Sequence, residues 1–105
     1  MAERITAENF TEKVLEAKTA VLVDFYSDSC IPCKMMSPVL SRLETGLAGK
    51  LAIYKVNVGY EQELVEKYEV QAAPTLIFFK NGAEAGRIRG AAKEADIRSE
   101  FEKIQ

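Results

Sequence analysis

The feature that most constrains the fold is an apolar run at residues 20–26, which is interrupted only by Asp24. Continuous apolar runs of this length are typical of strands that are buried on both faces of a sheet. A second strand pattern covers residues 51–58, and between the two lies a stretch, residues 36–47, whose apolar side chains recur at helical spacing. Strand, long helix and strand in this order predict a parallel β-α-β unit.

The second half of the chain predicts antiparallel strands. Residues 75–80 have a strong strand pattern, and Asn81-Gly82 separates them from a weaker strand pattern at residues 84–89. Asn-Gly between two strand patterns is typical of a hairpin turn. Together with helical patterns at residues 7–17, 61–68 and from 93 onward, this predicts an α/β fold. We expect a central mixed sheet of four to five strands, flanked on both sides by about four helices, with residues 1–105 forming a single domain.

The charges of the chain are nearly balanced and mixed in sign. Lys plus Arg number 14 and Asp plus Glu number 16, and no basic block stands out, so neither nucleic acid nor a membrane is an expected partner. No apolar stretch reaches 18 residues and the N-terminus does not resemble a signal peptide, which predicts a cytoplasmic protein. In a reducing compartment, a close cysteine pair is more often redox-active or metal-binding than a structural staple.

Such a pair exists, at Cys30 and Cys33, and three structural interpretations of it are weak. A zinc site needs four Cys or His ligands, whereas the chain has two cysteines and no histidine. A structural disulfide would close a minimal loop and stabilise little. Two inert buried thiols would not be expected among Ser, Asp and Pro. The pair is therefore best interpreted as a dithiol–disulfide couple.

A mechanism follows if the helix begins near Cys30. The positive end of the helix dipole and the unpaired N–H groups there favour a thiolate over a thiol. Pro32 would lie in the first turn, where its missing N–H matters little. The Cys30 thiolate would attack a substrate disulfide, and Cys33, one turn later, would attack Cys30 to release the reduced product.

These residues belong to stretches that resemble the thioredoxin family. The resemblance rests on "VLVDFYSDSCIPCKMMSPVL", on "AAPTLIFFKNG" and on the late Arg89-Gly90-Ala91, and it spans essentially the whole chain. It implies the thioredoxin fold. It also implies that Cys30 is the nucleophile and Cys33 the resolving thiol.

The resemblance assigns three further catalytic positions, each with an alternative. Asp24 matches a buried carboxylate that accepts the proton of Cys33, because burial raises a carboxyl pKa, but it could be a structural residue. Lys55 matches a lysine on the neighbouring strand that modulates Asp24, but it could be an exposed residue extending over the sheet edge. Pro74 matches a cis-proline facing the active site, but it could start the strand in trans.

The resemblance also implies a substrate groove, and this chain departs from the family pattern beside it. Ser29 stands where Trp is usual and Ile31 where Gly is usual, so some apolar contact area beside Cys30 is lost and some is restored. Arg89 replaces an apolar residue and would place positive charge beside the groove, which suggests a preference for acidic partner surfaces. The other groove positions implied by the resemblance are Val58, Ala72, Ala73, Gly90 and Ala91.

The resulting hypothesis is a cytosolic protein-disulfide reductase, a dithiol electron carrier without a bound cofactor or metal. The family resemblance implies protein disulfides as substrates and an NADPH- or ferredoxin-linked thioredoxin reductase that recharges the dithiol, and we expect a monomer. One alternative is a protein-disulfide oxidase or isomerase, because the dipeptide between the cysteines does not settle the direction of exchange. Another alternative is a thioredoxin-fold binding module whose thiols are dispensable.

Overall fold

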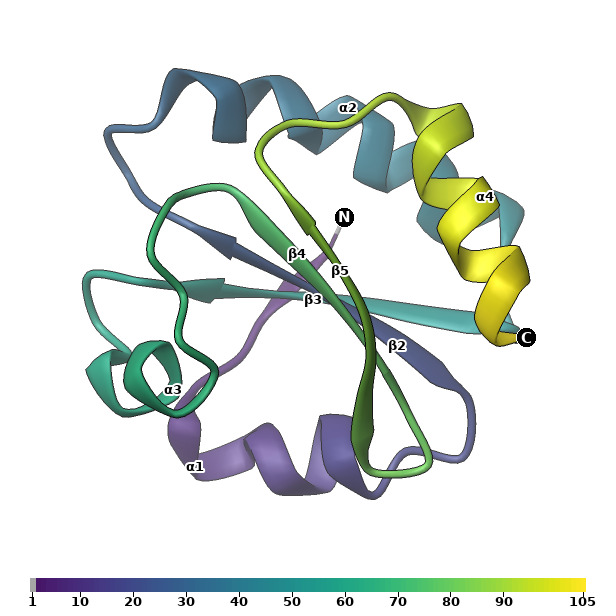
Figure 1. The fold of residues 1–105 in the computed structure, drawn as a ribbon, viewed down its shortest axis with the longest axis horizontal. Coiled ribbons are helices and arrows are strands. Elements are labelled where there is room, and N and C mark those ends of the chain that lie inside the picture. The colour runs from purple at the N-terminus through teal and green to yellow at the C-terminus, as the bar shows by residue number, and fades with distance from the viewer. Residues whose placement is uncertain (1) are drawn as a thin grey trace.

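The computed structural model describes residues 2–105. It contains a five-stranded mixed sheet in the order β1-β3-β2-β4-β5, with α2 and α4 over one face and α1 and α3 over the other (Figure 1). This architecture confirms the predicted α/β fold and is consistent with the thioredoxin fold. The elements are β1 (Glu3–Arg4), α1 (Ala7–Phe10), the π-helix η1 (Thr11–Leu15), β2 (Ala20–Tyr26), α2 (Ile31–Gly46), β3 (Leu51–Asn57), α3 (Gln62–Lys67), β4 (Thr75–Lys80), β5 (Ala83–Arg89) and α4 (Glu94–Ile104).

The sheet is mixed because its two halves are connected differently. β1, β3 and β2 run parallel, and the long helix α2 provides the crossover between β2 and β3. β4 is antiparallel to β2, and β5 is antiparallel to β4. The β4–β5 connection is the predicted hairpin, in which Asn81 and Gly82 have φ values of 54° and 81°. Positive φ at both central residues is the conformation that makes Asn-Gly favourable in a two-residue turn.

The central strand β2 explains the apolar run at residues 20–26, since both of its faces are buried. Side chains alternate along a strand, so Val21, Val23 and Phe25 pack toward α1 and α3. Ala20 and Leu22 pack on the opposite face, among side chains of α2 and α4. Asp24 is the next residue on that second face, and the alternation therefore directs its carboxyl group toward α2 rather than to solvent.

Helix α2 begins directly after the first cysteine. Cys30 is its N-cap, with an extended backbone at φ −89° and ψ 111°, and Ile31 is the first helical residue. Pro32 lies in the first turn, as predicted, and Pro38 lies inside the helix. Met36, Leu40 and Leu43 are buried against the sheet, so α2 is fixed along its length and its N-terminus is held at the end of β2.

Candidate active site

The two cysteines form a disulfide at the N-terminus of α2. Cys33 is only 5% exposed, whereas Cys30 is partly exposed. The backbone N–H of Cys33 donates to Sγ of Cys30 at 3.1 Å, which is the capping bond that an N-terminal residue makes. This hydrogen bond and the helix dipole both stabilise negative charge on Cys30 Sγ once the disulfide is opened. The geometry therefore favours Cys30 as the accessible thiolate and Cys33 as the sheltered partner.

A second segment approaches Cys30 from the opposite side. The carbonyl oxygen of Ala73 lies 3.4 Å from Sγ of Cys30, and the Ala73–Pro74 peptide bond is cis. The hydroxyl of Thr75 donates to the carbonyl of Ala72 at 2.6 Å, and the N–H of Gly90 donates to the carbonyl of Pro74 at 2.8 Å. These bonds tie the segment that contains Ala73 and Pro74 to the start of β4 and to the residue directly after β5, next to the disulfide.

Gly90 has a conformational role in this arrangement. Its φ is +91°, in the region that residues with a Cβ rarely adopt, while no atom lies within 4 Å of the place that a Cβ would occupy. The need for glycine at this position is therefore set by backbone conformation rather than by crowding.

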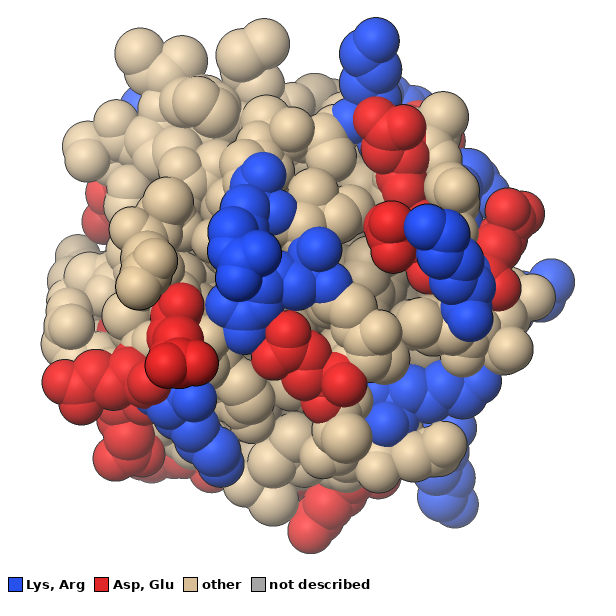
Figure 2. Space-filling model, viewed as in Figure 1, with Lys and Arg blue, Asp and Glu red and all other residues tan. Residues whose placement is uncertain are grey.

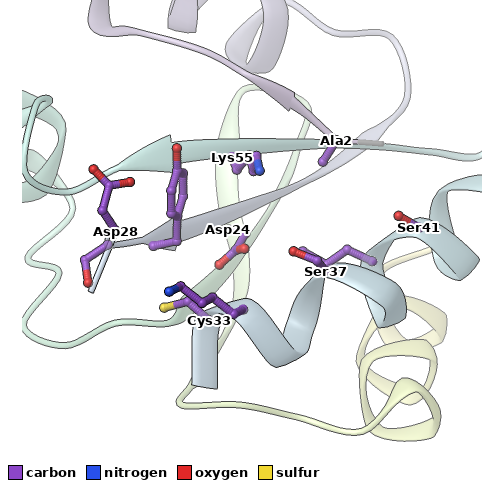
Figure 3. Close-up of a pocket in the computed structure, with 11 residues that line it drawn as sticks. Ala2, Asp24, Asp28, Cys33, Ser37, Ser41 and Lys55 are labelled. Carbon is purple, nitrogen blue, oxygen red and sulfur yellow. The ribbon is translucent and has the colours of Figure 1, made fainter. Parts of the chain in front are cut away.

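Behind the disulfide, Asp24 is a buried carboxyl group with one oxygen that makes no hydrogen bond to any described residue. Asp24 is 3% exposed, and the oxygen without a partner among those residues is Oδ1. Burial raises its pKa from 3.8 to about 7, and the charge of Lys55 opposes that rise. Asp24 and Cys33 both line a cavity of about 170 Å³ between the sheet and α2 (Figure 3). A carboxyl group with this pKa, in the same cavity as the sheltered thiol, can exchange a proton with that thiol at neutral pH.

Lys55 lies beside Asp24 on the neighbouring strand. The two residues are register partners in the parallel β2–β3 pair, and both line the cavity (Figure 3). Lys55 is half-buried, and β3 is bonded to β1 on one side and β2 on the other. Lys55 is therefore not a fully exposed residue of an edge strand, and its role toward Asp24 stays a prediction.

The predicted groove residues come from several segments of the chain. Ser29 and Ile31 flank Cys30, and Ile31 is 70% exposed. Val58 is placed at the end of β2 by the hydrogen bond from its N–H to the carbonyl of Tyr26. Ala72 and Ala91 are exposed.

Arg89 lies at the end of β5, where it pairs with Thr75 directly after Pro74. It is exposed and lines a polar hollow together with Glu69, Glu84 and Arg87. Figure 2 shows basic side chains gathered over β5 with acidic ones beside them. Arg87 donates to Glu84 and to the carbonyl of Tyr68, and these bonds hold its side chain against the protein surface.

Sequence reasoning missed the other side chains that line the cavity. Tyr26 faces it because Tyr26 is two residues after Asp24 on the same strand. Ser37 faces it because Ser37 is four residues after Cys33 on α2. Both spacings were signals in the sequence, but they become informative only once Asp24 and Cys33 are known to face each other.

Two structural findings bear on other kinds of site. Among residues 2–105, no group of three or more His, Cys, Asp or Glu side chains is arranged to hold a metal ion. Within the same residues, none of the helices has the length and apolarity needed to cross a membrane.

Comparison with known proteins gives a consistent result. A family model described as Thioredoxin matches residues 1–103. The chain is 41% identical to thioredoxin C-2 of Corynebacterium nephridii over 92 residues, which is 88% of this chain and 85% of that protein. It is 36% identical to a thioredoxin of Rickettsia bellii over 84 residues, 80% of each chain. It is also 34% identical to the chloroplastic thioredoxin M-type of Spinacia oleracea over 99 residues, which is 94% of this chain but only 55% of the spinach protein's length.

Proposed function

The chain belongs to the thioredoxin family of dithiol thiol–disulfide oxidoreductases, and from this premise we propose that it is a protein-disulfide reductase that works through Cys30 and Cys33. The observation that carries the proposal is the Cys30–Cys33 disulfide at the N-terminus of α2, with the buried carboxyl group of Asp24 in the cavity behind it. The reactive group is the chain's own dithiol, so the reaction needs no bound cofactor.

The first step is attack on a substrate disulfide. In the reduced protein, the Cys30 thiolate attacks one sulfur of the substrate, and a mixed disulfide forms while the other substrate sulfur leaves as a thiolate. The N–H of Cys33 and the N-terminus of α2 support the negative charge on Cys30 before the attack. Cys33 does not take part in this step because it is buried and cannot reach the substrate sulfur.

The second step releases the product. Asp24 accepts the proton of Cys33, and the resulting thiolate attacks Sγ of Cys30. The disulfide seen in the structure forms, and the second substrate sulfur leaves as a thiolate that takes up a proton. Two electrons have then passed from the dithiol to the substrate. Lys55 modulates this step because its charge favours the ionised form of Asp24.

The groove for the substrate is proposed to run between Cys30 and the segment tied to β4 and β5. Pro74 and the carbonyl of Ala73 supply its backbone wall, which supports extended binding of a target segment. Ile31 supplies exposed apolar area, and Arg89 supplies a positive charge. The remaining positions of the groove are Ser29, Val58, Ala72, Gly90 and Ala91.

We further propose a partner reductase, a cellular location and an oligomeric state for the protein. Continuous turnover needs a partner reductase, linked to NADPH or to ferredoxin, that returns the disulfide to the dithiol. A cytoplasmic location suits a reductant, because the cytosol keeps thiols reduced. Residues 1–105 would act as one domain and as a monomer, and the family match over residues 1–103 supports the single domain.

Trapping tests the proposal directly. The Cys33→Ser variant should accumulate mixed disulfides with protein substrates on Cys30, because the second step is blocked. The Cys30→Ser variant is the matched control and should trap nothing. The wild-type protein should reduce insulin disulfides when dithiothreitol is supplied. Absence of both trapping and insulin reduction would reject the enzymatic function, and activity that survives replacement of both cysteines by serine would favour a binding module instead.

A further inference from the structure

Tyr26 is a side chain of the cavity to which the mechanism above gives no role. It ends β2 and lies two residues after Asp24, so both side chains face α2, and both line the same cavity. Tyr26 is partly buried, and its hydroxyl accepts a hydrogen bond from Arg4 of β1 at 3.4 Å. The tyrosine ring is therefore held between β1 and the cavity.

The ring of Tyr26 is in contact with the cation that modulates Asp24. Nζ of Lys55 lies 5.1 Å from the centroid of the ring, within the range of a cation–π interaction. The backbone alone does not fix this position. A lysine side chain is flexible and strongly hydrated, and one on a half-buried strand position can extend to bulk water instead.

We propose that Tyr26 is a positioning residue whose ring keeps the Lys55 ammonium group inside the cavity, within electrostatic reach of Asp24. This inference concerns the geometry of the cavity, and its consequence for catalysis rests on the proposed function. Without the ring, the ammonium group moves toward solvent and its charge is screened by water.

The consequence follows from the balance of effects at Asp24. Burial raises the pKa of Asp24, and among the described residues the charge of Lys55 lowers it. A ring that holds Lys55 in place therefore keeps more Asp24 ionised at neutral pH, in the form that accepts a proton from Cys33. Among residues 2–105, the titratable and charged groups that line the cavity are Asp24 and Tyr26 of β2, Asp28 of the following loop, Cys33 and Lys34 of α2, and Lys55 of β3.

The test is a carboxyl-carbon NMR titration of Asp24 in the oxidised protein. Tyr26→Leu should raise the Asp24 pKa, in the same direction as Lys55→Met and by a comparable amount. Tyr26→Phe retains the ring and should retain the wild-type titration. In the Lys55→Met background, Tyr26→Leu should have no further effect, because the ring then has no cation to hold.

A matched control exists on the other face of the sheet. Nζ of Lys13 lies 6.0 Å from the ring centroid of Tyr54, and Tyr54 packs against the core on the side of the sheet that α1 and α3 cover. Tyr54→Leu removes a comparable ring and should leave the Asp24 titration unchanged. If Tyr26→Leu leaves the Asp24 pKa unchanged or lowers it, or if its effect persists in the Lys55→Met background, the proposal is overturned.

A measurement on the wild-type protein keeps the proposal testable even if Tyr26→Leu fails to fold. A lysine ε-methylene held over an aromatic face resonates upfield, and this ring-current shift should be present at Lys55 and lost in Tyr26→Leu where that variant folds. Its absence from the wild-type spectrum would overturn the proposal. The Asp24 titration and the Lys55 ring-current shift are measured without a substrate. A wild-type protein that fails to reduce insulin would therefore contradict the proposed function but not the role of Tyr26.

Discussion

Asp24 makes the folded protein sensitive to pH in a direction opposite to most carboxyl groups. Its pKa is raised from 3.8 to about 7 by burial, so the folded state holds a proton that the unfolded state has already lost. The contribution of Asp24 to the free energy of unfolding should therefore be complete below pH 4. It should be lost progressively as the pH rises toward 7. Three pH units at about 1.4 kcal/mol each give a loss of about 4 kcal/mol at most.

Replacement of Asp24 by Asn tests this account of stability. At pH 8, Asp24→Asn should be more stable than wild type by a few kcal/mol, on the order of the loss above, because no ionised carboxylate is buried. At pH 4 the two proteins should be nearly equal, since Asp24 is then neutral. Urea unfolding at both pH values measures the difference. An equal gain at both pH values would show that ionisation of Asp24 is not its cause.

Gly90 is expected to contribute both to stability, through its backbone conformation, and to activity, through its hydrogen bond to Pro74. Gly90→Ala forces a Cβ into φ +91° and should destabilise the fold by about 1–2 kcal/mol. It should also reduce kcat/KM for protein disulfides, because the N–H of Gly90 bonds to the carbonyl of Pro74, and Pro74 directly follows Ala73, whose carbonyl lies against Cys30. Gly49 has φ +84° and is equally uncrowded, yet it lies in the turn after α2. Gly49→Ala should lose similar stability and keep full activity, and an equal loss of activity in both variants would contradict the role of Gly90.

At the scale of elements, helix α2 couples stability and reactivity. Ile31 is the first helical residue and is 70% exposed, so a charge there acts on the helix N-terminus without disturbing the core. Ile31→Glu should stabilise the helix and, by repelling negative charge on Cys30, slow the reaction of reduced protein with iodoacetamide at pH 6. The expected change is about two- to fivefold. Ile31→Gln is the uncharged control, and an equal slowing in that variant would contradict the electrostatic explanation.

A helix, strand or turn was predictable from the sequence where a short local pattern is specific for it. The Asn81-Gly82 turn was predictable because few dipeptides accept two positive φ values. The apolar run of β2 was predictable because burial on both faces leaves no polar alternation. The π-helical turn η1 was not, because its apolar spacing resembles that of an α-helix and its i→i+5 bonding leaves no mark in the sequence.

The whole molecule brings together groups that no local pattern links. The cavity joins Asp24, Cys33 and Lys55 from three elements, and the family resemblance named them without showing that they share one space. Tyr26 and Ser37 were not predicted as cavity residues, because their placement depends on how α2 packs over the sheet. The catalytic roles of Asp24, Cys33 and Lys55 remain predictions.

The choice of protein substrate also depends on how distant segments come together. Arg89 of β5 pairs with Thr75, directly after Pro74. Arg89→Val should reduce the preference for disulfides flanked by acidic residues over those flanked by neutral ones, by about two- to fivefold for one exposed charge pair. The ratio of kcat/KM for two matched peptide disulfides measures this preference. Raising the salt concentration should reduce the wild-type preference in the same direction. An unchanged ratio in Arg89→Val would reject a role for this charge in recognition.

The reduction potential of the Cys30–Cys33 couple decides whether the protein reduces or oxidises disulfides, because a reductase must transfer electrons to its substrates. It is measured by equilibrating the protein with defined ratios of reduced and oxidised glutathione at pH 7. A reductase should have a potential below about −250 mV, at or below the poise of cytosolic glutathione. A potential near or above about −180 mV would contradict the account and assign the protein to the oxidation or isomerisation of disulfides.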